Sequence, residues 1–254
     1  MIPLKTEWHA ATDVGARREV NEDRYFASDA LGLWAVVDGM GGTSCGDWAA
    51  SRIIDELSAL TPVDDLDGMI ADAAGAIRKA NSIIFNEAAA RGDQMGSTAV
   101  VLVIRHDRFA VIWVGDSRAY LERGGRLYRL TRDHSHVQEL IDGGLLSAGE
   151  AESHPLRHVL TRAVGVHEAI EIDMLRDTLQ PEDLLLLCSD GLHGVIGETE
   201  IESILTSASL SEASRIMIER CHAKGAPDNI TMVTVTASEP TLVRFGRLDP
   251  EMVE

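Results

Sequence analysis

The sequence predicts an α+β domain, because short strand-like runs occur along the same chain as longer segments of helical periodicity. The runs combine apolar and β-branched residues and are bounded by glycine, asparagine or aspartate, as strands are. Two longer segments place apolar residues three and four positions apart, as amphipathic helices do. With 254 residues and 45% hydrophobic content, the chain can bury one sizeable core.

One domain is expected over residues 1–238, followed by a tail at residues 239–254. Repeats, low-complexity tracts and linker-like stretches are not found before the tail, and disorder is the simplest interpretation of the tail itself. Neither a signal-peptide pattern nor an apolar run of membrane-spanning length is visible. We therefore expect a cytoplasmic protein without a membrane partner, and we expect it to be a monomer.

Charge and cysteine content argue against a nucleic-acid-binding surface and against a metal site built from cysteines. The formal net charge of −18, with lysine and arginine scattered along the chain, argues against a nucleic-acid partner. The three cysteines, Cys45, Cys188 and Cys221, lack the spacing of a metal site. Cys188 lies within an apolar run and is expected to be a small buried residue.

The first half of the chain predicts strands and then two helices. Residues 8–28 are strand-like at both ends with a charged loop between, and residues 33–37 are an apolar run expected to form a buried strand that ends at Asp38. Residues 47–60 and 66–91 have the periodicity of amphipathic helices, which core packing explains fully.

The second half begins as a predicted β meander and then changes character. Residues 131–162 contain four histidines, a short helix-like piece and a Gly-Gly pair, and an insertion of this kind is typical of a flap. Within it, His134 and His136 would suit a transition metal, but surface histidines on a polar loop are the simpler interpretation. The meander is predicted at residues 97–104, 109–114, 119–121 and 127–130, later strands at residues 171–174, 184–188 and 230–235, and later helices around residues 201–205 and 211–222.

Four carboxylates stand at the ends of probable strands: Asp38, Asp116, Asp190 and Asp228. Strands buried in one core tend to place their ends together, so these acids can meet at one rim. Crowded carboxylates repel one another unless protons or a cation neutralise them. Oxygen ligands without cysteine or histidine suit Mg²⁺ or Mn²⁺ better than zinc. A single Asp-Gly after a strand is most simply a turn, and the repetition is what favours an ion site.

The charged loop between residues 15 and 23 carries Arg18 and Glu22. An arginine can hold two phosphate oxygens in bidentate fashion, and an acidic pair nearby, Glu22-Asp23, can bind the waters around a metal ion. An ordinary solvated loop would have the same composition, so this segment gains meaning only beside the four strand-end acids.

Eight motifs in this order resemble the metal-dependent serine/threonine protein phosphatases of type 2C, the PPM family, in their compact bacterial form. The resemblance covers about residues 12–235 and implies a four-layer α-β-β-α sandwich, with two mostly antiparallel central sheets, metal ions at one end and the flap at residues 131–162. The motifs are GARREVNED, VVDGMGG, GSTAVV, VGDSRAYL, LTRDHS, HPLRHVLTRAVG, LLLLCSDGL and DNITMVTV.

The resemblance also implies a set of metal ligands. Asp38 matches the acid that bridges two metal ions, and Gly39 matches the residue whose carbonyl oxygen completes one site. Asp190 and Asp228 match the other acids of the dimetal centre. Asp116 matches the ligand that bacterial members use with Asp190 for a third, weaker ion. The expected cofactor is Mn²⁺ or Mg²⁺.

Further roles follow from the same resemblance. Arg18 matches the phosphate-binding arginine, Glu22 matches the acid that orients metal-bound water, and Asn229 is expected to fix Asp228. A hydroxide bridging two metal ions then attacks phosphorus in line, while the ions and Arg18 neutralise the phosphoryl oxygens. No covalent phosphoenzyme is needed, so Cys45 and Cys188 are not expected to be nucleophiles.

The proton donor to the leaving oxygen is where the sequence departs from the family pattern. Eukaryotic relatives have a histidine directly after the Asp-Gly, where this chain has Met40, and bacterial relatives usually have one after DGMGG, where it has Thr43. His158, or a water on the third metal ion, is our hypothesis for the donor.

The predicted function is hydrolysis of phosphoserine and phosphothreonine on proteins, opposing a bacterial serine/threonine kinase. Phosphorylated proteins and a cognate kinase are thus the expected partners. Two other functions stay open on the same fold. A catalytically silent binding module predicts loss of at least one acid, and none is missing. A small-molecule phosphomonoesterase or pyrophosphatase would differ only in the flap and surface.

Overall fold

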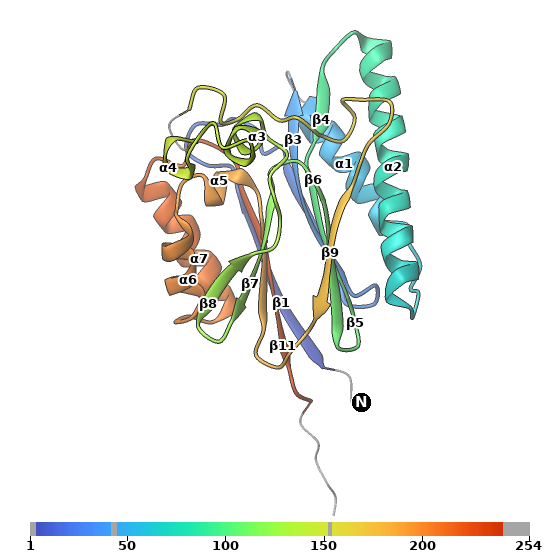
Figure 1. The fold of residues 1–254 in the computed structure, drawn as a ribbon. Helices are drawn as coiled ribbons and strands as arrows, with labels where there is room; N and C mark the ends of the chain where they lie inside the picture. The colour runs from blue at the N-terminus through green and yellow to red at the C-terminus, as the bar shows by residue number, and fades with distance from the viewer. Residues whose placement is uncertain (1–3, 42–44, 152–153, 241–254) are drawn as a thin grey trace, which may run out of the picture.

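Two antiparallel β-sheets lie face to face at the centre of the protein, and helices cover the outer face of each (Figure 1). The structure is a computed structural model that describes residues 4–41, 45–151 and 154–240. The four-layer α-β-β-α arrangement that the resemblance implies is confirmed. Within the described ranges, no helix has the length and apolar character needed to cross a membrane.

The first sheet is buried on both faces, as its central strands show. In the run of residues 184–188, Leu185 and Leu187 face the second sheet, whereas Leu184, Leu186 and Cys188 face the helices. Burial on both faces explains why this strand is apolar throughout rather than alternating. In spatial order the strands are β1 (Lys5–Asp13), β11 (Ile230–Ser238), β10 (Leu184–Cys188), β7 (Arg118–Arg123) and β8 (Arg126–Arg129).

The second sheet carries the acid-bearing strand near its edge. The predicted β meander is wrong in one respect: its first two strands belong to this sheet and its last two to the other. The chain crosses at Gly115, which has a φ of 102°, a left-handed value that glycine adopts without strain. In spatial order the strands are β2 (Asp23–Ser28), β3 (Leu33–Gly41), β5 (Ala99–Arg105), β6 (Arg108–Val114) and β9 (Asp173–Thr178), with β4 (Met95–Ser97) paired to the end of β3.

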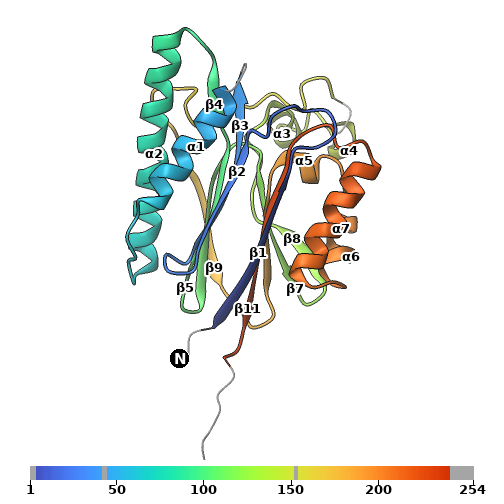
Figure 2. The same cartoon turned by 180° about the vertical axis from the view of Figure 1, so that it is seen from behind.

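One helix pair covers each sheet (Figure 2). Over the second sheet lie α1 (Cys45–Ser58) and α2 (Leu66–Arg91), close to the helices predicted from periodicity. The longer helix begins after Asp65, whose side chain accepts from the Gly68 amide, and ends at Gly92 in the left-handed conformation. The first sheet is covered by α6 (Glu198–Leu205) and α7 (Leu210–Ala223).

The predicted flap lies over the end of the sandwich near the tip of β3 (Figure 1). It contains α3 (His136–Asp142) and α4 (Ala148–Ala151), and α5 (Asp190–His193) lies at the same end of the molecule. The interpretation of His134 as a surface histidine is wrong, because its ring is buried. It stacks against Trp113, and its Nδ1 accepts the Gly115 amide at 3.1 Å.

The domain boundaries stay a prediction. Most of the tail expected at residues 239–254 lies outside the described residues, as does Thr43.

Candidate metal centre

A pocket of about 550 Å³ opens at the end of the sandwich beside the flap. Six of the seven predicted site residues line it, although they come from segments far apart in the sequence. They are Arg18, Glu22, Asp38, Gly39, Asp190 and Asp228.

Thr98 holds both backbone groups of Asp38 by hydrogen bonds. Its amide donates to Thr98 Oγ1 at 3.1 Å, and its carbonyl oxygen accepts from the Thr98 amide at 2.8 Å. The expectation that the strand ends at Asp38 is wrong, because Gly39–Gly41 continue it by pairing with β4. Asp38 therefore lies within β3, directly opposite Asp23 of β2.

Gly39 lies where two segments approach too closely for a side chain. A Cβ at this position would lie 2.1 Å from the Gly46 carbonyl oxygen and 2.8 Å from that of Glu22. Its amide donates to the Glu22 carbonyl oxygen at 3.2 Å. Only glycine lets the start of α1 and the loop before β2 meet at this strand.

Asp190 and Asp228 enter the pocket from two adjoining segments. Asp190 begins α5, two residues after β10 ends, and Asp228 lies two residues before β11. The segments touch at Gly191, where a Cβ would lie 1.8 Å from the Asn229 carbonyl oxygen. One oxygen of Asp228 accepts the Asn229 amide at 2.9 Å, and the other accepts Arg18 Nη2 at 2.7 Å.

Asn229 acts mainly on the loop before β2, which differs in part from the expected role. Its backbone amide does bond to Asp228, but its side chain donates to the carbonyl oxygens of Val14 and Val20 at 2.9 and 3.1 Å. Its Oδ1 accepts the Glu22 amide at 2.8 Å. The side-chain amide of Asn229 thus holds the segment that carries Arg18 and Glu22 against the start of β11.

Asp116 is the predicted residue that does not line the pocket. It follows β6, is largely buried, and its carbonyl oxygen lies 3.0 Å from His193 Nε2. Burial raises the pKa of Asp116 well above its usual value, and the charge of Asp190 raises it further. Asp116 therefore interacts electrostatically with Asp190 of the pocket without lining the pocket itself.

The carboxylates of the site oppose one another's ionisation. Burial raises the pKa of Asp38 well above its usual value, and the charges of Asp23, Asp190 and Asp116 add to the effect. Burial likewise raises the pKa of Asp23 to about 7, against the hydrogen bond from Ser189. Burial also opposes ionisation of Asp190, yet the nearby rings of His158 and His193 keep its pKa below the usual value.

These observations fit a hard divalent cation. The donors are carboxylate and carbonyl oxygens, and the buried Oδ1 of Asp23 has no hydrogen-bond partner among the described residues. A dication would offset the repulsion that raises the pKa of Asp38. In the present side-chain positions, no three acidic, histidine or cysteine side chains of the described residues surround a common ion position. Asp228 is engaged by Arg18 instead.

Sequence reasoning did not predict where Asp23 lies or that Arg157 belongs to the site. Asp23 belongs to the predicted acidic pair and is 2% exposed, but only the pairing of β2 with β3 places it opposite Asp38. Arg157 lines the pocket from the flap, and no pattern in the sequence singles it out. His158, the hypothetical proton donor, also lines the pocket, with Nδ1 3.6 Å from Asp190 Oδ2.

The cysteines are all buried and free, as expected for Cys188. Burial raises the pKa of the Cys188 thiol far above its usual range and that of Cys221 to about 11. Protonated, enclosed thiols are poor nucleophiles.

Comparison with known proteins yields one family. The profile of the family described as Protein phosphatase 2C matches residues 14–140. The serine/threonine phosphatase Stp of Listeria welshimeri is 35% identical over 247 residues, covering 93% of this chain and 96% of that protein. The serine/threonine protein phosphatase PstP of Mycobacterium tuberculosis is 33% identical over 234 residues, covering 91% of this chain and 45% of that protein.

Solved structures agree with the sequence matches. PppA, described as a key regulatory component of T6SS in Pseudomonas aeruginosa, is similar with a TM-score of 0.86 at 37% identity, covering 91% of this chain and 97% of that one. The catalytic domain of the serine/threonine protein phosphatase PstP, solved with two manganese ions, is similar with a TM-score of 0.84 at 32% identity, covering 93% and 100%.

Proposed function

This chain belongs to the protein phosphatase 2C family, and from that membership we propose that it hydrolyses phosphoserine and phosphothreonine on proteins in a metal-dependent reaction. One observation carries the proposal. The pocket gathers Asp38, Asp190 and Asp228 around one opening and places Arg18 among them. An arginine among carboxylates suits a phosphate ester whose charge is shared between a cation and a guanidinium.

The metal ligands we propose are Asp38, the carbonyl oxygen of Gly39, Asp190 and Asp228 for two ions, and Asp116 with Asp190 for a third, weaker one. Mn²⁺ or Mg²⁺ held there would supply Lewis-acid activation of the attacking water and neutralise charge on the phosphoryl group. The manganese-bound PstP catalytic domain supports this choice of metal.

The chain's own residues then orient the phosphate and handle protons. Arg18 is half exposed at the pocket and can turn from Asp228 to the phosphoryl oxygens, which it would hold in bidentate fashion. Glu22 lines the same pocket and would accept a hydrogen bond from the attacking water. His158, which is exposed beside Asp190, would give a proton to the leaving serine or threonine oxygen.

The partners we propose are phosphorylated proteins and a serine/threonine kinase whose action this enzyme reverses. The regulatory description of PppA and the names of the Stp and PstP relatives support that setting. We propose further that the enzyme works as a monomer in the cytoplasm. Gel filtration at micromolar concentration and fractionation of cells test these two points.

The decisive experiment is Mn²⁺-dependent phosphate release from a phosphothreonine peptide. Wild type is compared with Asp38→Ala and Asp190→Ala, with EDTA as the metal control and Asp72→Ala, an exposed position on α2, as the matched variant. We expect activity in wild type and Asp72→Ala only. A folded, metal-binding but inactive wild type would instead indicate a binding module. Inorganic pyrophosphate and small phosphate esters turned over far faster than the peptide would indicate a small-molecule phosphatase.

A further inference from the structure

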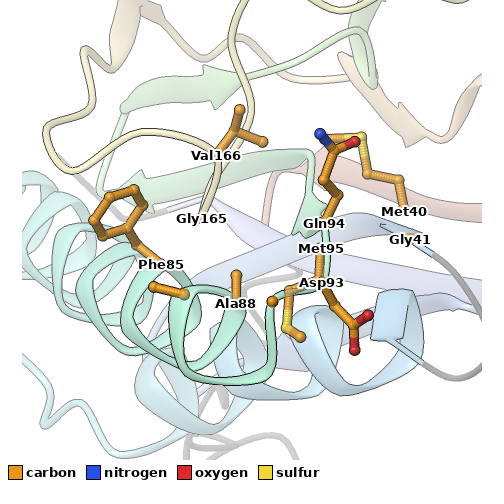
Figure 3. A pocket seen from close by; sticks show the side chains of 11 residues that line it. Met40, Gly41, Phe85, Ala88, Asp93, Gln94, Met95, Gly165 and Val166 are labelled. Atoms are coloured by element: carbon orange, nitrogen blue, oxygen red, sulfur yellow. The ribbon is translucent and has the colours of Figure 1, made fainter.

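A second cavity of about 550 Å³ lies next to the acid-lined pocket, between the end of α2 and the tip of β3 (Figure 3). Its lining is mostly apolar. Phe85 and Ala88 contribute from α2, Met95 from β4, and Val166 from the segment after the flap. A cavity of this size is within the range of ligand sites and can take a large side chain.

The two cavities share a wall. Met40 and Gly41, the last two residues of β3, line both of them, and Figure 3 shows Met40 at the edge of the apolar cavity beside Gln94. Along a strand the rise is about 3.3 Å per residue, so Gly41 lies roughly 10 Å from Asp38. An extended peptide covers that distance in about three residues.

From this juxtaposition we propose that the apolar cavity binds an apolar side chain of the phosphoprotein substrate, two or three residues away from the phosphorylated residue. The inference rests on the proposed phosphatase function and deepens it, because it adds a sequence preference to the same site. Leucine, methionine and phenylalanine match the lining.

A negative charge at the opening of the apolar cavity limits which substrate side chains can bind there. Of the described residues that line the cavity, Asp93 alone is charged, and it is exposed. A glutamate or aspartate in the substrate at this position would lose hydration against an apolar wall and face a like charge. The cavity therefore selects for uncharged apolar residues and against acidic ones.

The side of the cavity wall formed by Gly165 is held in place by hydrogen bonds. Gly165 donates its amide to Asn81 Oδ1 at 2.7 Å, and Val164 exchanges two backbone hydrogen bonds with Ser97 at 2.8 and 3.0 Å. At Gly165 a Cβ would lie 2.2 Å from Ile84 Cγ2. A preformed wall lets an apolar side chain bind without an ordering cost in the enzyme.

The test uses phosphothreonine peptides that differ at one position, with leucine, alanine or glutamate placed two or three residues before or after the phosphothreonine. For at least one placement we expect kcat/KM about tenfold higher with leucine than with alanine, and lowest with glutamate. Turnover of p-nitrophenyl phosphate, which cannot reach the cavity, serves as the reference.

Two variants on α2 separate the cavity from the rest of the surface. Ala89 is exposed and lines the cavity, so Ala89→Trp fills it, whereas Ala90 is exposed on the same helix and does not line it. With Ala89→Trp the leucine preference should fall below about twofold, while Ala90→Trp should keep it. Both variants should keep wild-type turnover of p-nitrophenyl phosphate.

Three results would overturn the inference. Equal kcat/KM for leucine and alanine at every placement removes the side-chain subsite but leaves the phosphatase proposal intact. A leucine preference that survives Ala89→Trp places the subsite elsewhere. Loss of turnover of all peptides and of p-nitrophenyl phosphate by the wild type would reject the proposed function itself, and the subsite with it.

Discussion

Arg18 Nη2 lies 2.7 Å from Asp228 Oδ2, so the proposed phosphate-binding cation and one proposed metal ligand hold each other across the pocket. Their segments are 210 residues apart in the sequence. Both side chains keep solvent contact, with 50% and 33% exposure, so the pair contributes little to folding stability. The pair matters for the site instead. A phosphate that binds Arg18, or a metal ion that binds Asp228, would have to break the ion pair between them.

Replacing Arg18 should therefore impair catalysis with little effect on stability. We expect Arg18→Ala to lower kcat/KM for a phosphothreonine peptide by about 10²-fold, since a charged donor to the phosphoryl oxygens is lost. Arg18→Lys should restore part of the rate, because it keeps the charge but loses the bidentate geometry. Initial rates and urea unfolding measure the two effects. A rate loss matched by an equal loss of folded protein would contradict the assignment.

Asp38→Asn should stabilise the metal-free protein while removing its response to metal. Burial and neighbouring carboxylates raise the pKa of Asp38, so its ionised form is unfavourable in the folded protein. In EDTA we expect a higher melting temperature than wild type, and with Mn²⁺ we expect the stabilisation seen for wild type to be absent. Asp72→Asn, at an exposed site on α2, should match wild type in both conditions.

The pH dependence gives a second measure of the same effect. A carboxyl whose pKa is higher in the folded state binds protons on folding, so the free energy of unfolding falls as pH rises above the unfolded value near 3.9. In EDTA, wild type should lose stability with rising pH more steeply than Asp38→Asn. Equal slopes would show that ionisation of Asp38 does not cause the loss of stability at higher pH.

Local pattern was enough to predict most elements, because their signals lie within one segment. The helix at Leu66–Arg91 and the strand at Leu184–Cys188 have the predicted bounds, and six of the seven candidate residues meet in one pocket. Strand-end acids could be found this way because three of them follow an apolar run and Asp228 lies just before one. Their roles as ligands came from the family resemblance and stay predictions.

What local pattern could not show depends on pairing between distant segments. Nothing in the residues around Asp23 indicates that it faces Asp38, because that follows from the register of two strands. The continuation of β3 through Gly41 depends on β4, which begins at Met95. The flap histidine His134 is buried where the ring of Trp113, from β6, stacks on it.

Asn81 should be a strong determinant of stability although it does not line the acid pocket. Its buried side chain donates to the carbonyl oxygens of His167 and Glu168 at 2.9 and 3.1 Å and accepts the Gly165 amide at 2.7 Å. Asn81→Ala leaves these groups without partners, and we expect a loss of about 2–4 kcal/mol in the free energy of unfolding. Urea denaturation measures it. Ser82→Ala, exposed on the same helix, should change the stability by less than about 0.5 kcal/mol.

His134 should make the protein less stable in mild acid. Burial lowers the pKa of His134, and the charge of Arg162 lowers it further, against the opposing effect of Asp173. The unfolded chain then binds a proton below a pH of about 6.5 that the folded protein resists, so stability is lost as pH falls through that value. His134→Gln should flatten this part of the curve, and its amide oxygen can still accept from Gly115.

Urea unfolding at a series of pH values between about 5 and 8 measures the difference between the two proteins, which isolates His134 from the carboxyl groups that also titrate in acid. His167→Gln is the matched control, because His167 is exposed. It should follow the wild-type curve. If His134→Gln also follows the wild-type curve, the ring of His134 takes up its proton as readily in the folded protein as in the unfolded chain, and burial against Trp113 does not control its charge.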